Sequence, residues 1–147
     1  MKYFKILAIL AAFGATDAYG AGSEDKTEDT SGADYQSAET AILAGNFAQA
    51  LPILSALIDA EPDNADAWNL LGFASRKSGD LAAAEIAYAT ALKINPDHLG
   101  ALEYQGEMYL ELMQPDMAKA NLARLQSLCG DCEEAEDLAQ ALAAAGA

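Results

Sequence analysis

Apolar residues recur at intervals of three and four along most of the chain after residue 33, in segments separated by Gly, Pro, Asn and Asp. Residues at these intervals share one face of an α-helix, so the pattern predicts amphipathic helices. The chain is therefore expected to be all-α. Six helices are expected near residues 33–44, 47–60, 65–78, 81–94, 99–112 and 115–128.

The helical pattern repeats itself along the chain. A step of 34 residues relates Ala50 to Ala84 and Ala118. The phrase that begins at Gly45 nearly copies the phrase that begins at Gly79. Such a period is the signature of a repeat architecture, in which each unit buries its apolar face only against its neighbours. Three units are expected, near residues 31–64, 65–98 and 99–132.

The middle unit carries the most specific motif, formed by Trp68, Leu71, Gly72, Ala84, Tyr88, Ala91 and Pro96. This motif resembles the tetratricopeptide repeat (TPR) pattern W-x2-L-G-x2-Y…A-x3-F…P. Ser75 stands where that pattern has Tyr, and Tyr88 where it has Phe. The resemblance implies a TPR-type helical solenoid of about three helix-turn-helix repeats. Since TPR proteins usually bind other proteins, it also implies an adaptor for a protein or peptide.

Turn residues mark the ends of the first helices. Gly45 and Gly79 are expected to end these helices in the left-handed conformation. The third unit departs from this pattern, because Met113 stands at its turn and Gly130 replaces its terminal proline. Pro115 is expected in the first turn of its second helix.

A seventh helix is expected near residues 132–144, where it would cap the solenoid with one polar face. Asp131 is a suitable N-cap, with Glu134 three residues on as its capping-box partner. The expected apolar stripe consists of Ala135, Leu138, Ala139 and Leu142.

The N-terminus has the pattern of an export signal. Lys2 and Lys5 precede an apolar run of about ten residues, and small residues follow at the positions that a signal peptidase prefers. The protein is therefore expected in the periplasm or secreted. The alternative is an uncleaved membrane anchor, although a bilayer span needs roughly 20 apolar residues. The expected segments are a signal peptide at 1–20, a disordered acidic linker at 21–32 and the TPR domain at 33–147.

Acidic residues dominate the charge. The chain carries 23 acidic and 8 basic residues, for a formal net charge of −15. Removal of residues 1–20 would leave 22 acidic and 6 basic residues, a net charge of −16. Nucleic acid is not expected as a partner, because phosphate contacts need a basic face, and anionic lipid surfaces are disfavoured for the same reason. The acidity serves either solubility alone or the selection of a basic partner.

The resemblance also implies where a partner would bind. In TPR domains the first helix of each hairpin lines a concave surface. An acidic groove interrupted by apolar side chains is expected there, and it would suit a peptide with Lys or Arg and apolar anchors. The alternative is an ordinary solvated helix face. The residues expected in the groove are Tyr35, Glu39, Ile42, Asp66, Asn69, Phe73, Arg76, Glu103, Glu107 and Leu110.

Binding of a chaperone C-terminus is not expected. TPR proteins with that function use Lys, Arg and Asn at groove positions. At the corresponding places this chain has Asn69, Phe73, Gly100 and Tyr104. Only the asparagine resembles that carboxylate-binding set.

Cys129 and Cys132 form a CxxC pair between the third unit and the last helix. In an oxidising compartment this pair is expected to form a structural disulfide, worth about 2 kcal/mol to the stability of the terminal helix. The alternative function of the chain is a thiol–disulfide redox protein that uses the same pair. Acidic residues around the pair disfavour the reactive thiolate that such a protein needs.

No cofactor, metal site or enzymatic activity is expected. Two cysteines do not complete a four-ligand metal site. The single histidine, His98, lies a full repeat before Cys132 and is expected at a helix start. The chain also lacks a glycine-rich phosphate loop and a nucleophile elbow. Glu103 and Glu107 lie one helical turn apart, which is a common surface arrangement of carboxylates.

Overall fold

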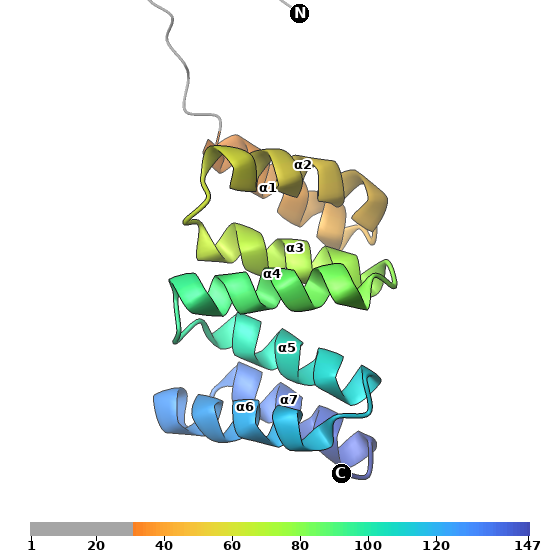
Figure 1. Ribbon diagram of the computed structural model, residues 1–147, viewed down its shortest axis with the longest axis vertical. Coiled ribbons are helices and arrows are strands. Elements are labelled where there is room, and N and C mark those ends of the chain that lie inside the picture. Colours follow the sequence, from red (N-terminus) through yellow and green to blue (C-terminus); the bar gives the residue numbers. More distant parts are fainter. Residues whose placement is uncertain (1–30) are drawn as a thin grey trace, which may run out of the picture.

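The computed structural model describes residues 31–147, which form three stacked helical hairpins and a terminal helix (Figure 1). This all-α TPR-type solenoid confirms the fold predicted from the sequence. The expected signal peptide and nearly all of the acidic linker lie outside the described residues. The seven described helices are α1 Ser31–Leu43, α2 Phe47–Ala60, α3 Ala65–Lys77, α4 Leu81–Ile94, α5 Leu99–Glu111, α6 Pro115–Cys129 and α7 Glu133–Ala144.

Within residues 31–147, none of the helices combines the length and the apolar character that a bilayer crossing requires. The expected helix boundaries agree with the observed ones to within two residues. Pro115 is the first residue of α6, as predicted. At this position the missing N–H of proline does not remove any helical hydrogen bond.

The turns inside the three hairpins share one backbone geometry. Gly45 and Gly79 have φ values of +73° and +88°, which confirms the left-handed helix ends expected for them. Met113 occupies the same position in the third hairpin with φ +59°. The next residue, Gln114, donates its N–H to the Tyr109 carbonyl at 2.7 Å, and Asn46 makes the equivalent bond to Ala41 at 2.8 Å. The third unit therefore keeps the turn without the glycine.

Replacement of Met113 by Gly is expected to raise the free energy of unfolding by about 0.5–1 kcal/mol. An L-residue pays about 1–2 kcal/mol for the left-handed conformation, and the greater freedom of unfolded glycine offsets part of the gain. The Met113 side chain is 86% exposed, so little packing is lost. Chemical denaturation measures the change. The control Met117→Gly, within α6, should lower the free energy of unfolding. An equal loss in both variants would contradict the claim that the left-handed conformation of Met113 costs stability.

Polar side chains cap the starts of three helices. The side chains of Asn64 and Asp80 each accept a backbone N–H of their own helix at 3.0 Å. His98 caps α5 with Nδ1, 3.2 Å from the Ala101 nitrogen, which confirms its expected place at a helix start. Each bond satisfies one of the N–H groups that a helix start leaves unpaired.

The N-cap expected for α7 was wrong. Cys132, not Asp131, is the N-cap of α7, because its carbonyl accepts the first helical bond from Glu136 at 3.0 Å. Asp131 lies exposed between the end of α6 and this cap. The cap makes no side-chain hydrogen bond, so the expected capping box with Glu134 does not form.

The core is a series of layers between neighbouring helices rather than one central cluster. One cluster joins α1, α2 and α3, and a second joins α4 to α7. The apolar residues of α7 belong to the second cluster, so α7 closes this end of the solenoid as expected. The first cluster is built around Ala38, Ala41, Ala50, Leu54 and Ala74, and the second includes Tyr88, Leu102, Met108, Leu125, Leu138 and Leu142.

Two glycines allow close helix contacts. A Cβ atom on Gly72 would lie 2.6 Å from two ring carbons of Tyr88, whose side chain is fully buried. A Cβ atom on Gly106 would lie 2.6 Å from a methyl group of Leu138 in α7. The glycine of the motif therefore makes room for the aromatic residue of the same hairpin. Its counterpart in the third unit makes room for the capping helix.

Gly72→Ala is expected to lower the free energy of unfolding by about 1–3 kcal/mol, even though Ala favours helix, because overpacking a filled core costs about that much. In the control Gly100→Ala, the added Cβ would lie 3.2 Å from the Asn69 side-chain nitrogen and at least 3.7 Å from the His98 ring, so this variant should cost less or nothing. Thermal and urea unfolding of both variants measure the difference. A neutral or stabilising Gly72→Ala would contradict the tight contact with Tyr88.

Candidate functional site

The first helices of the three hairpins share one face of the solenoid, which we call the first-helix face (α1, α3 and α5). A hollow of about 230 Å³ lies on this face. Since helices of all three units line it, the hollow exists only when the units are stacked. Its lining residues are Glu39, Ile42 and Leu43 from α1, Leu70 and Phe73 from α3, and Tyr104 from α5. We call this the aromatic hollow.

Aromatic rings hold the aromatic hollow in shape. The Phe73 and Tyr104 rings lie 4.9 Å apart between centroids, and the Phe47 ring meets Phe73 edge-on at 6.2 Å. Such tilted and edge-to-face contacts are favourable beyond the area they bury. Leu43 is 89% exposed at the rim. The hollow thus combines a rigid aromatic wall with an apolar rim residue open to solvent.

Basic side chains lie over one wall of the hollow. The Lys77 Nζ atom is 5.3 Å and the Arg76 guanidinium carbon 5.6 Å from the centre of the Phe73 ring, within cation–π range. Lys77 is exposed, whereas Arg76 is only 5% exposed. Arg76 pairs with Glu107 at 2.5 Å and with Glu111 at 2.8 Å. Arg76 and Glu107 therefore link α3 to α5, and Arg76 is a structural residue beneath the face.

Glu103 is a buried acid between α5 and α7. It is 7% exposed. Its pKa is raised to about 8, first by burial and then by the nearby carboxylates of Glu107, Asp137 and Glu134 in that order of effect. Two of these acids belong to α7. The capping helix therefore lies near Glu103, which is buried although it was expected in an open groove.

A second hollow, of about 410 Å³, lies beside the first at the start of α1. Tyr35, Glu39 and Asp66 are among its lining residues. Burial raises the pKa of Tyr35 to about 12, with Asp66 and then Glu39 as the further causes. The Asp66 carboxylate lies 2.9 Å from His98 Nε2, and its side chain remains 69% exposed.

The structure divides the residues expected in the groove into accessible and covered ones. Tyr35, Glu39, Ile42, Asp66 and Phe73 line the two hollows. The covered positions are Asn69, Arg76 and Glu103, each less than 10% exposed, and Leu110, which packs against the core. Whether any of them contacts a partner stays a prediction.

Two lining residues of the aromatic hollow, Leu43 and Leu70, were not expected in the groove. A third, Tyr104, was placed at a groove position only in the comparison with chaperone-binding TPR proteins and was not expected to contact a partner. Leu43 and Tyr104 are direct sequence neighbours of the expected residues Ile42 and Glu103. The sequence signal for Leu43 was that two apolar residues, Ile42 and Leu43, follow each other at the end of the first helix. Because the core needs only one of them, the other could lie on the surface.

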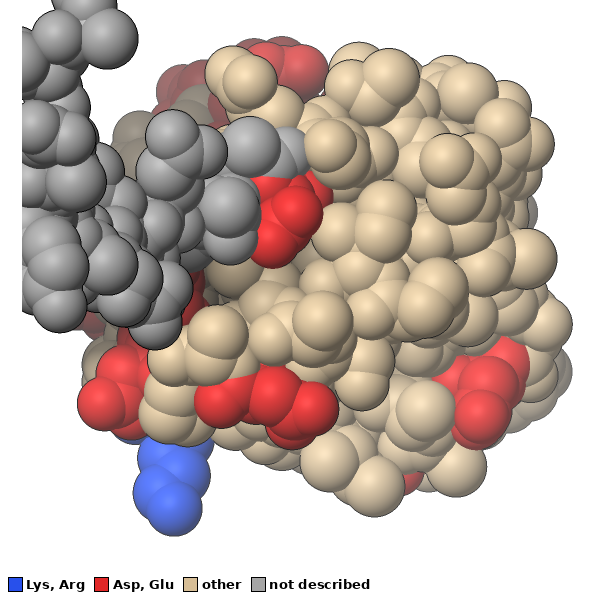
Figure 2. Space-filling view, turned by 90° about the horizontal axis from the view of Figure 1, so that it is seen from above, with Lys and Arg blue, Asp and Glu red and all other residues tan. Residues whose placement is uncertain are grey.

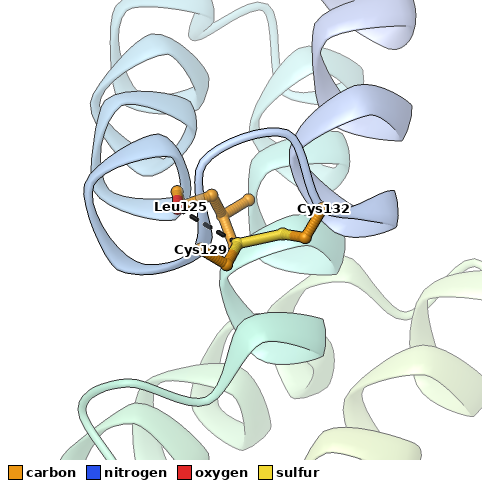
Figure 3. The surroundings of a disulfide bond; sticks show 3 residues. All are labelled: Leu125, Cys129 and Cys132. Carbon is orange, nitrogen blue, oxygen red and sulfur yellow. Dashed lines mark hydrogen bonds between the residues drawn. A yellow bond between two sulfur atoms is a disulfide. The ribbon is translucent and has the colours of Figure 1, made fainter.

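The two cysteines lie at the junction of α6 and α7 (Figure 3). Their sulfur atoms are bonded at 2.01 Å in the structure. Cys129 is the last residue of α6, and its sulfur also lies 3.2 Å from the Leu125 carbonyl oxygen. Among residues 31–147, no group of three or more His, Cys, Asp or Glu side chains is arranged to hold a metal ion.

Comparison with known proteins supports the fold. Residues 35–98 match the family model described as tetratricopeptide repeat. The structure is similar to the first TPR of Spaghetti (RPAP3) bound to an HSP90 peptide, with a TM-score of 0.71 and 19% identity, covering 80% of this chain and 97% of that one. The first TPR domain of human RPAP3 gives a TM-score of 0.69 and 20% identity over 80% of this chain and 95% of that chain.

A MamA RS-1 double mutant is also similar, with a TM-score of 0.63 and 23% identity over 67% of this chain and 55% of that one. No curated protein matches the chain. The family match over residues 35–98 and the likeness in fold both support a TPR-type helical solenoid for the described helices.

Proposed function

We propose that this chain is an exported adaptor that binds a protein or peptide partner on its first-helix face. The aromatic hollow carries the proposal, because it is an apolar, solvent-open site built jointly by three repeats. A structural neighbour with the same fold was solved with a bound peptide, which supports peptide binding as a use of this fold.

The chemistry around the hollow favours a partner segment with an apolar anchor next to Lys or Arg. The hollow offers Phe73, Tyr104 and Leu43 to the anchor, while Glu39 borders both hollows. The acids that contribute to the raised pKa of Tyr35 support a negative potential on this side. A basic partner also suits the net charge of −15, since complementary charge accelerates encounter.

A peptide selection tests this proposal. The protein is immobilised and offered a random peptide library, and enrichment of an aliphatic or aromatic residue beside Lys or Arg is expected. Leu43→Asp should weaken binding of an enriched peptide by about tenfold or more, because it places a charge at the mouth of an apolar site, a loss of about 1.4 kcal/mol.

The matched control for this experiment is Ile86→Asp on α4. Ile86 is 66% exposed and lines neither hollow, so its replacement should leave peptide affinity unchanged. Failure to enrich any motif would contradict the proposal. Equal losses in the two variants would show that binding occurs elsewhere.

Export is the second part of the proposal and rests on the sequence of residues 1–20. The intact mass of the protein recovered from producing cells tests it. Loss of about the first 20 residues, with recovery outside the cytoplasm, is expected. An uncleaved chain in the cytoplasm would contradict it.

We propose a structural role for the Cys129–Cys132 bridge, with the redox protein as the alternative outcome. The bridge links the end of α6 to the N-cap of α7, so it holds the capping helix. Replacing both cysteines by Ser should lower the free energy of unfolding by about 2 kcal/mol in the loop-entropy model. A reduction potential below about −300 mV is expected for a structural bridge, whereas a clearly higher value would favour the redox protein.

A further inference from the structure

One line of side chains along α3 changes from acidic to apolar to basic. Its members follow each other at intervals of three and four residues, so they share one face of the helix. They are Asp66, Leu70, Phe73 and Lys77, which we call the α3 stripe. Its acid lines the second hollow, its two apolar residues line the aromatic hollow, and its lysine lies over the Phe73 ring. The stripe covers about 16 Å along the helix axis.

The acidic end of the stripe has no basic counterpart. Asp66 shares the second hollow with Glu39 and Glu61, and within residues 31–147 no Lys or Arg forms an ion pair with these three acids. The side chain of Asn64 donates to the Glu61 carboxylate at 2.7 Å and holds it in place. Neither the N-terminus of α3, equivalent to about half a positive charge, nor His98, 2.9 Å from Asp66, balances three carboxylates.

The sign of the surrounding surface is the same. Seen from the end of the solenoid at which α1 lies, the described residues show acidic side chains at several places and basic ones only at one margin (Figure 2). A cation that approaches the second hollow therefore meets attraction from the site and from the surface around it.

The basic end of the stripe carries a cation without a carboxylate partner. Lys77 is exposed, and among the described residues it pairs with no Asp or Glu. Its Nζ atom lies 5.3 Å from the centre of the Phe73 ring, at the wall of the aromatic hollow. Glu107 and Glu111 also lie at this end of the first-helix face, but both pair with Arg76. The aromatic hollow thus has unpaired acids on one side and an unpaired base on the other.

We propose that the first-helix face selects a partner segment in which an apolar anchor lies between a basic and an acidic residue. The basic side chain would lie in the second hollow against Asp66 and Glu39, the anchor in the aromatic hollow, and the acid at Lys77. This inference rests on the proposed peptide-binding function and adds the order of charges around the anchor. A segment with two basic or two acidic flanks would place like charges in contact at one end, which disfavours it.

The length of the α3 stripe sets the spacing of this motif. An extended chain advances about 3.3 Å per residue and turns alternate side chains to the same side. Three side chains at every second position therefore face the surface over about 13 Å, and the long side chains of Arg and Glu cover the remainder. The basic and the acidic residue are each expected two positions from the anchor.

Three synthetic peptides test the proposal. Each has seven residues, blocked ends and a central Leu among serines, with one Arg and one Glu, two Arg, or two Glu placed two positions from the Leu. NMR titration of the labelled full chain at 0.15 M salt, which screens distant charges, gives the dissociation constants. The peptide with one Arg and one Glu should bind about threefold more tightly than the peptide with two Arg, and the peptide with two Glu should bind most weakly.

Lys77→Glu is expected to change this order. The variant should bind the peptide with two Arg at least about threefold more tightly than the parent does, and the mixed peptide more weakly by a similar factor. The control Lys93→Glu makes the same change of charge at an exposed position of α4 that lines neither hollow, so it should keep the parental order. Circular dichroism of both variants establishes that they are folded.

The outcomes separate this inference from the function on which it rests. Equal affinity for the mixed and the two-Arg peptide, unchanged by Lys77→Glu but lost when the central Leu becomes Ser, would overturn the order of charges and leave peptide binding intact. Affinities that follow only the net charge of the peptide, with Lys77→Glu and Lys93→Glu acting alike, would overturn it as well. If none of the peptides bound at millimolar concentration, both proposals would be contradicted.

Discussion

Replacement of Arg76 by Ala is expected to lower the free energy of unfolding by about 3 kcal/mol. Removal of one partner from a buried ion pair leaves the other charge without compensation, which typically costs about 3–5 kcal/mol. Here Glu107 and Glu111 are 27% and 44% exposed, so solvent reduces the penalty toward the lower end. Urea denaturation measures the change.

Two further variants separate the causes of this loss. Arg76→Met removes the charge but keeps most of the volume next to Phe73, so it should recover part of the stability. Glu111→Gln weakens only the more exposed partner and should cost less than about 1 kcal/mol. If Arg76→Ala were as stable as the parent, the link between α3 and α5 would not contribute to stacking.

The second large effect is a dependence of stability on pH that originates at Glu103. The pKa of Glu103 is about 8 in the folded chain, against an ordinary value of 4.5. Between these values the folded chain holds a proton that the unfolded chain has lost. The free energy of unfolding is therefore expected to fall as pH rises from about 5 to about 8, by up to about 1.4 kcal/mol per pH unit, and to level off above that range.

Glu103→Gln isolates this effect from the general repulsion of an acidic protein. The variant mimics the protonated acid, so it should be close to the parent at pH 5 and clearly more stable at pH 8. The control Glu136→Gln removes an exposed acid of α7 and should leave the slope with pH nearly unchanged. A parental slope retained in Glu103→Gln would show that the dependence on pH does not originate at Glu103.

Much of the fold could be predicted because each unit of a repeat protein packs mainly within itself and against its direct neighbours. The 34-residue step from Ala50 to Ala84 and Ala118 identifies positions that are fully buried in all three units. Gly45 and Gly79 mark turns through a backbone conformation that glycine adopts without cost. Met113 adopts the same left-handed conformation, although this costs a residue other than glycine free energy. The third turn therefore forms even though the glycine that marks the other two turns is missing.

The candidate site was less predictable, because it depends on distances between units. Arg76 and Glu107 were both expected to face a partner, and the structure pairs them with each other. Nothing within one repeat indicates that Glu103 is buried or that acids of α7 lie near it. Leu43 was missed because a regular helix pattern does not distinguish a core residue from an apolar residue at the rim of a hollow.

Mapping of the peptide site by NMR tests the central claim most directly. A peptide enriched by selection is titrated into the isotope-labelled protein, and the changes in amide and side-chain shifts are followed. The largest changes are expected at Ile42, Leu43, Leu70, Phe73 and Tyr104, with small changes on α4 and α6. Changes centred on α4 or α6, with the aromatic hollow unaffected, would contradict the account.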